Sequence, residues 1–213
     1  TKTDIPVCDY AVNPYVGCTH GCKYCYASFM KRFTNHPEPW GTFLDVKYWP
    51  EIRKPEKYAG KELFFGTVTD PYNPQEEQYC RTRALLEQLQ GSGVKITIQT
   101  KSDLVLRDID LLRTFPGLRV GFSINTLDEG FRADNAVSIE RRLTAMKVLH
   151  EEGIRTTCFI SPIFPALTDV FAIIGRVKDQ CQLVWLENLN LRGSYKAVIL
   201  GYIQHKHSEL TGL

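Results

Sequence analysis

Short apolar runs alternate with amphipathic segments along most of the chain. From about residue 60 onward, five runs have the composition of buried or half-buried strands: 62–66, 94–98, 118–122, 154–160 and 182–188. Five other segments carry apolar residues at helical spacing: 74–90, 102–115, 138–152, 167–179 and 195–208. With one more strand running into Gly17, the pattern predicts six strands, each followed by a crossover.

The predicted helices begin and end at residues that favour helix termini. Asn73 and Pro74 suit an N-cap and a first helical position, and Ser138 opens a later helix that ends before Gly153. A repeat of strand and helix predicts parallel strands joined by right-handed crossovers. Six such units in 213 residues favour an α/β fold, a partial (β/α)6 barrel of parallel strands rather than a closed eight-fold barrel.

One segment does not follow the repeat. Residues 31–59 are rich in proline and aromatic residues, and we interpret them as an irregular excursion within the first crossover. No internal repeat or low-complexity tract divides the chain, so we expect a single domain over 1–213. The chain opens at Thr1 rather than at a methionine and shows no apolar leader, which we interpret as a trimmed or partial version of a longer chain.

Composition and charge narrow the class of protein. The chain is 43% hydrophobic and 23% charged, and it has no apolar run long enough to span a membrane. The net charge is +2, and we interpret the scattered basic pairs at 31–32, 53–54 and 141–142 as solvated surface, so charge does not support nucleic-acid binding. Seven cysteines without a disulfide-scaffold pattern predict a reducing, cytoplasmic location.

Three cysteines stand close together after the first predicted strand, in the segment NPYVGCTHGCKYCY: Cys18, Cys22 and Cys25. Thiolates favour zinc, Cu(I) and iron–sulfur clusters. A structural zinc would need a fourth ligand, for which Cys8 and His20 are candidates. A redox dithiol would use only the last two cysteines, whereas a [4Fe–4S] cluster held by all three would leave one iron open for an outside ligand.

The spacing C-x3-C-x2-C, with Tyr24 before the last cysteine, resembles the radical S-adenosylmethionine (SAM) superfamily. The wider context is similar to the spore photoproduct lyase branch of that superfamily. Further matching segments follow successive predicted strands over about 110 residues: Thr69-Asp70-Pro71-Tyr72, Thr100-Lys101-Ser102 and Ser123-Ile124-Asn125-Thr126. The superfamily commonly has Gly-Gly-Glu after its second strand, and both the lyase branch and this chain (66–70, GTVTD) lack it.

The resemblance implies a radical SAM enzyme whose [4Fe–4S] cluster is held by the three cysteines. The open iron would bind the amino and carboxylate groups of SAM. An electron from a donor such as flavodoxin or ferredoxin would then cleave SAM to a 5′-deoxyadenosyl radical. This radical would abstract hydrogen from an unidentified substrate. By motif position, the SAM contacts fall on Tyr26 (main chain), Thr69, Lys101 and Ser123. The alternatives to SAM binding are purely structural: Thr69 would cap a turn, Ser123 would end a strand and Lys101 would be solvated.

The resemblance to the lyases is incomplete. In those enzymes a cysteine that returns a hydrogen atom to the repaired thymine precedes the position matched by Thr69, and this chain has Val68 there. We therefore do not expect spore photoproduct lyase activity. Cys158 is either a displaced donor or a buried core thiol, and we favour the buried thiol.

The substrate is not predicted by the sequence. Four polar residues follow or end the last strand and suggest either a polar substrate site or an ion pair at the barrel rim: Glu187, Asn188, Asn190 and Arg192. A DNA photoproduct lyase-type enzyme, a non-catalytic zinc-binding α/β module and a radical SAM protein that turns nothing over remain as alternatives.

Overall fold

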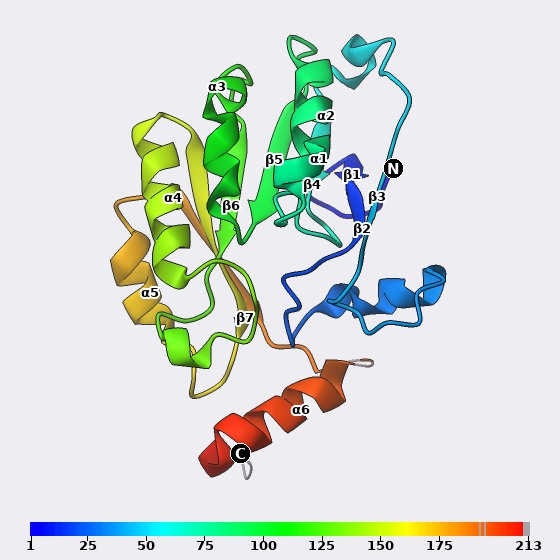
Figure 1. Cartoon of the computed structure of the whole chain (residues 1–213). Helices are drawn as coiled ribbons and strands as arrows, with labels where there is room; N and C mark the ends of the chain where they lie inside the picture. The colour runs from blue at the N-terminus through cyan, green and yellow to red at the C-terminus, as the bar shows by residue number, and fades with distance from the viewer. Residues whose placement is uncertain (192, 194, 211–213) are drawn as a thin grey trace.

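The computed structural model describes residues 1–191, 193 and 195–210, and a parallel β-sheet forms its centre (Figure 1). The six strands lie in the order β1-β4-β5-β6-β7-β8, and each neighbouring pair is parallel. Their bounds are β1 (Tyr10–Val12), β4 (Glu62–Phe65), β5 (Lys95–Thr100), β6 (Arg119–Ser123), β7 (Arg155–Ile163) and β8 (Leu183–Asn188). This open sheet confirms the predicted partial (β/α)6 barrel.

Helices cover one face of the sheet, with α2, α3 and α4 side by side in Figure 1. The α-helices are α1 (Glu76–Tyr79), α2 (Arg81–Leu89), α3 (Ile109–Leu112), α4 (Ile139–Glu151), α5 (Val170–Val177) and α6 (Tyr195–Lys206). Short 3-10 helices are η1 (Tyr26–Phe33), η2 (Pro55–Tyr58), η3 (Asp103–Asp108), η4 (Glu129–Phe131) and η5 (Ser208–Leu210). No helix among the described residues has the length and apolarity that crossing a membrane requires.

The core lies between the sheet and these helices. Alternate residues of each strand point toward the helices, because side chains on a strand alternate between its two faces. On β7, Cys158 and Ile160 are fully buried in this core, while Phe159 and Ser161 lie on the opposite, inner face of the sheet. The side chains on the helix side of each strand therefore form the core, and the side chains on the other side face the concave interior of the partial barrel.

The predicted first strand is wrong in its extent. The chain leaves the sheet after Val12, because Pro14 lacks an amide hydrogen and restricts the residue before it. A separate strand, β2 (Tyr15–Gly17), then pairs antiparallel with β3 (Leu44–Val46). The segment 31–59, interpreted as irregular, thus supplies β3 as well as part of η1 and all of η2.

Two predicted helices are also divided. The helix expected over 74–90 breaks at Cys80, whose φ is 47°. The carboxylate of Glu76 accepts hydrogen bonds from the amides of Thr82 (2.9 Å) and Arg83 (3.2 Å), so a buried side chain caps α2 where a continuous helix would use main-chain carbonyls. The helix expected over 102–115 is a 3-10 turn, η3, followed by the short α3. The N-cap predicted at Ser138 is confirmed, since its hydroxyl accepts from the amide of Arg141 at 3.2 Å.

Candidate active site at the carboxyl edge of the sheet

The loop that carries the three cysteines begins directly after β2 and lies against the connection between β6 and α4. The amide of Lys23 donates to the carbonyl of Ala133 (2.9 Å), and the amide of Asn135 donates to the carbonyl of His20 (2.7 Å). A second apolar cluster, which contains Tyr24, packs this loop against α6 through Ile199. The loop is therefore fixed by main-chain contacts from one side and by α6 from another.

The three thiols lie within electrostatic reach of one another. Burial, and then the charge of Asp70, raises the pKa of Cys18 to about 12, with a further contribution from Cys25. Burial likewise raises the pKa of Cys22, Lys101 opposes this, and Cys25 and Cys18 add to it. The raised pKa values of Cys18 and Cys22 favour their protonated form, so thiolates at these two positions require a bound positive charge such as the irons of a cluster.

The donor set is compatible with an iron–sulfur cluster. Within the described residues, no three His, Cys, Asp or Glu side chains converge to hold one metal ion. A [4Fe–4S] cluster binds each cysteine at a different iron, so its thiolates need not converge on one point. Thiolates are also the ligands that such clusters use.

The two candidates for a fourth protein ligand lie at different places relative to the three thiols. Nε2 of the buried His20 lies 3.1 Å from Oδ2 of Asp70. Cys8 precedes β1, at the amino edge of the sheet beside Glu62, the first residue of β4, whereas Cys18 lies beyond the carboxyl edge. A four-ligand zinc site that included Cys8 would require a different arrangement of the chain.

Asp70 connects the cysteine loop with the ends of two strands. Its Oδ1 accepts from the hydroxyl of Thr100 (2.7 Å) and the amide of Tyr72 (2.9 Å), and its Oδ2 accepts from the amide of Lys101 (2.7 Å). Burial alone would raise the pKa of Asp70, but His20 and these donors hold it below its ordinary value. Sequence reasoning noted Asp70 only as part of a motif and did not predict this role.

Lys101 and Tyr26 both approach the cysteine loop. Nζ of Lys101 lies 5.5 Å from the ring centroid of Tyr24, and its charge partly offsets the rise that burial causes in the pKa of Cys22. Tyr26 is the first residue of η1, and its hydroxyl donates to the main-chain carbonyl of Thr67. Although 58% of Tyr26 is exposed, burial of the phenol, together with nearby Cys25 and Glu187, raises the pKa of Tyr26 to about 12.

Thr69 and Ser123 are both buried, and their hydroxyls differ in whether a proton remains for a hydrogen bond to a ligand. Thr69 donates its only hydroxyl proton to the carbonyl of Gly17 at 2.6 Å, so toward a ligand it can only accept. Ser123 accepts from Nε2 of Gln99 at 2.9 Å, which leaves its own proton free to donate. The structure thus brings the four residues expected to contact SAM to one edge of the sheet, with Thr69 also fixing the residue before Cys18.

A buried ion pair stands behind this edge and was missed from the sequence. Arg142 was interpreted as solvated surface, but its side chain is fully buried and Nη2 lies 2.6 Å from Oδ1 of Asp134. Asp134 also accepts from the hydroxyl of Tyr24 (2.9 Å), while Nη1 of Arg142 donates to the carbonyl of Ser123 (3.3 Å). The available signal was position: Arg142 is three residues from Ile139, on the buried face of α4.

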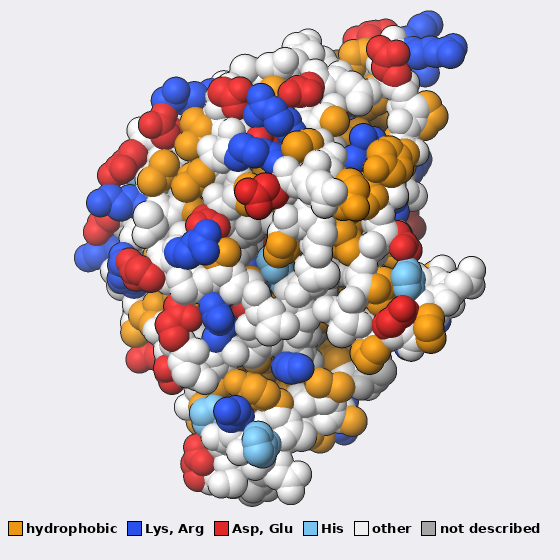
Figure 2. Space-filling view, viewed as in Figure 1, with side chains coloured by type: hydrophobic (Ala, Val, Ile, Leu, Met, Phe, Trp, Pro, Cys, Tyr) orange, Lys and Arg blue, Asp and Glu red, His pale blue; other side chains and the backbone are white. Residues whose placement is uncertain are grey.

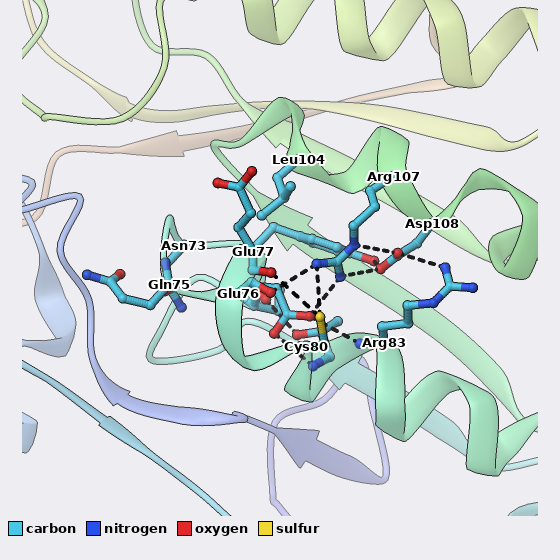
Figure 3. A network of polar contacts seen from close by, with 12 residues as sticks. Asn73, Gln75, Glu76, Glu77, Cys80, Arg83, Leu104, Arg107 and Asp108 are labelled. Carbon is cyan, nitrogen blue, oxygen red and sulfur yellow. Dashed lines mark hydrogen bonds and ion pairs between the residues drawn. The ribbon is translucent and has the colours of Figure 1, made fainter.

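A second polar network, centred on Glu76 and Arg107, contacts β2 (Figure 3). The fully buried Glu76 accepts from the hydroxyl of Tyr15 on β2 and forms an ion pair with Nη2 of Arg107 at 2.9 Å. Arg107 also contacts Asp108 and, through Nη1, lies 3.6 Å from Sγ of Cys80. Each charge in the group has a partner, so we assign this network to holding β2, α1 and η3 together.

The comparisons with known proteins agree with this arrangement. The model of the Radical SAM superfamily matches residues 12–170. The chain belongs to this superfamily. An uncharacterized protein of Methanocaldococcus jannaschii is 40% identical over 196 residues, covering 90% of this chain and 74% of the relative. The Radical SAM Nalpha-GlyT isomerase of Pseudomonas phage M6 is 26% identical over 160 residues, covering 72% of this chain and 33% of that protein.

Solved structures show the same fold. A spore photoproduct lyase variant with bound AdoMet and dinucleoside spore photoproduct superposes with a TM-score of 0.71 at 16% identity, over 98% of this chain and 63% of the lyase. Streptococcus suis SuiB bound to S-adenosylmethionine superposes with a TM-score of 0.62 at 13% identity, over 93% of this chain and 48% of SuiB. The chain therefore has the radical SAM core fold and spans less than two thirds of either structure.

The remaining expected residues of this radical SAM chain lie as follows. Glu187 is exposed on β8, and its Oε2 accepts from the hydroxyl of Ser161 at 2.7 Å. Asn188 ends β8, and the carbonyl of Asn190 accepts from the hydroxyl of a tyrosine in α6. Arg192 lies outside the described residues, so an ion pair involving it is untested. Cys158 is a fully buried core thiol on the helix side of β7.

Proposed function

We propose that this chain is the core of a radical SAM enzyme in which Cys18, Cys22 and Cys25 hold a [4Fe–4S] cluster. The observation that carries the proposal is the grouping of three thiols in one loop, close to Lys101, at the carboxyl edge of a partial barrel. With SAM and one electron from a donor of the flavodoxin or ferredoxin class, such a cluster supplies a 5′-deoxyadenosyl radical. The protein's part is to bind, orient and enclose the reacting groups.

The chain's own residues divide these tasks. The Lys101 ammonium provides a point charge suited to the carboxylate of SAM, and the free hydroxyl proton of Ser123 can be donated to a SAM acceptor. Thr69, with its proton engaged by Gly17, holds the start of the cysteine loop and can offer only a lone pair to SAM. Tyr26 directly follows Cys25, the last cysteine of the loop. We propose that the main chain of Tyr26 contacts SAM.

We propose that the substrate binds on the inner face of β7 and β8. Val184 packs into the core on the helix side, so Trp185 and Glu187 belong to the opposite face, beside Phe159 and Ser161. The indole of Trp185 is half exposed, at 51%, and Glu187 is an acceptor with open solvent around it. This surface suits a substrate with a flat or apolar part and hydrogen-bond donors.

The details near Thr69 argue against repair of spore photoproduct. The half-buried Val68 cannot return a hydrogen atom, because aliphatic C–H bonds are too strong. Cys158 faces the helices and does not lie on the inner face of the sheet. The visible surface in Figure 2 interleaves basic and acidic side chains, which gives little electrostatic grip on phosphates.

Single-cysteine variants test the cluster. After anaerobic reconstitution, Cys18→Ala, Cys22→Ala and Cys25→Ala should each lose the brown visible absorption and all release of 5′-deoxyadenosine, because each removes a ligand to one iron. Cys8→Ala is the matched control and should retain both. If Cys8→Ala lost its metal as completely as Cys18→Ala, or the wild type bound one zinc and no iron, the zinc-binding module would be the better assignment.

A further inference from the structure

The indole of Trp40 makes a direct contact with the cysteine loop. Its Nε1 donates a hydrogen bond to Sγ of Cys25, with the two atoms 3.3 Å apart. An indole N–H can only donate, and a cysteine sulfur accepts more strongly as a thiolate than as a thiol. The donor comes from the excursion at 31–59, which was not expected to reach the site.

The turn that carries Trp40 is held against the cysteine loop. Both the amide and the hydroxyl of Thr42 donate to the carbonyl of Pro39, at 3.2 and 2.8 Å, which closes the turn. Gly41 has a φ of +99°, and a Cβ there would lie 2.9 Å from Cα of Gly21. Only glycine allows this backbone approach, and the approach fixes the position of the indole relative to the thiol.

Aromatic packing and ion pairs support the turn from the other side. The ring of Phe43 meets Trp40 edge to face, with centroids 5.7 Å apart, and stacks on His36 at 3.9 Å. His36 contacts Glu38 (3.1 Å) and Asp45 (2.9 Å). Asp45 lies on β3, whose partner strand β2 leads into the cysteine loop. The indole is thus part of a continuous packed structure.

We propose that Trp40 is a positioning residue that sets the reduction potential of the cluster through its hydrogen bond to the Cys25 thiolate. This inference rests on the cluster proposed above. When the donor delivers one electron, negative charge on the cluster sulfurs increases and the N–H···S bond strengthens, while no bond at Trp40 breaks. The hydrogen bond therefore stabilises the reduced cluster more than the oxidised one and raises the potential.

Trp40→Phe tests the proposal, with Trp49→Phe as the matched control. Phenylalanine keeps an aromatic ring but removes the donor, whereas Trp49 lies in the same excursion and its indole has no hydrogen bond to a cysteine in the described part of the chain. We expect both variants to bind wild-type amounts of iron. Redox titration followed by EPR should show the ratio of reduced to oxidised cluster falling about tenfold in Trp40→Phe, a shift of about 59 mV to more negative potential for one electron.

A second measurement does not depend on the stability of Trp40→Phe. In wild-type and Trp49→Phe protein grown with 15N-tryptophan, pulsed EPR of the reduced cluster should detect coupling to an indole nitrogen at hydrogen-bond range. Equal potentials in wild-type and Trp40→Phe protein, or the absence of that coupling, would overturn the role of Trp40. A wild-type protein that binds no cluster at all would instead refute the proposed function, and the hydrogen bond to a cluster thiolate with it.

Discussion

Replacing Arg142 by methionine should destabilise the fold by an amount that depends on pH. Arg142 and Asp134 are both fully buried and 2.6 Å apart, and methionine fills much of the space without the charge. Breaking a buried pair by removing one partner costs roughly 3–5 kcal/mol, because the other charge remains without compensation. The stability lost through the uncompensated charge has an upper limit here, because Asp134 can take up a proton.

That upper limit follows from the ordinary pKa of aspartate, 3.8. Protonating such a group at pH 7 costs about 4 kcal/mol, and at pH 5 only about 1.6 kcal/mol, at about 1.36 kcal/mol per pH unit. In the wild type, burial tends to raise the pKa of Asp134, but Arg142, then Lys101 and Tyr24, hold it lowered. Its contribution to stability is therefore present above the ordinary pKa and lost as pH falls through the lowered one. In Arg142→Met, burial raises the pKa instead, so the loss shrinks as pH falls from 7 to 5.

Urea unfolding of the cluster-free, reduced protein at pH 7 and pH 5, followed by circular dichroism, measures both quantities. We expect a loss of about 3–4 kcal/mol at pH 7 that falls by more than half at pH 5. Arg176→Met is the control, because Arg176 forms an exposed pair with Glu140 and should cost about 0–1 kcal/mol at either pH. A loss in Arg142→Met that matched the control, or that was the same at both pH values, would refute the reasoning.

Two further predictions concern ligand and substrate. Lys101→Ala should weaken SAM binding to the reconstituted protein by about 1.5–3 kcal/mol in calorimetry, because the ammonium would hydrogen-bond the SAM carboxylate. Lys23 is exposed in the cysteine loop, so Lys23→Ala should leave SAM binding unchanged. Unchanged affinity in Lys101→Ala would remove Lys101 from the site. The purified protein should cleave SAM yet leave a spore-photoproduct dinucleotide unconverted in mass spectrometry, because Val68 has no transferable hydrogen. Multiple-turnover repair would contradict this, and its loss in Cys158→Ala would identify a displaced donor.

Hydrophobic periodicity was sufficient for the main architecture. The strand at 94–98 alternates apolar and polar residues, and the helix at 138–152 carries an apolar stripe between Ser138 and Gly153, so each element was visible locally. The cysteine spacing likewise identified the loop, because the three cysteines lie within eight positions of the sequence. These features depend on neighbours within a few residues, which sequence patterns record directly.

Side-chain contacts that override local propensity could not be predicted from the sequence. The break at Cys80 follows from Glu76 capping α2, and propensity favoured a continuous helix. Arg142 was interpreted as surface because a charged residue is rarely buried, and its pairing with Asp134, eight residues away in the loop before α4, makes burial tolerable.

The sequence by itself thus determined the parallel strand–helix repeat, the superfamily and the loop that carries the thiols. Only the tertiary structure decided that Trp40 reaches Cys25, that Asp70 joins β4, β5 and the cysteine loop, and that Cys158 faces the helices. The physical reason is the range of the interactions. Periodicity and spacing act between neighbours along the chain, whereas a hydrogen bond or buried charge depends on segments that only the packed fold brings together.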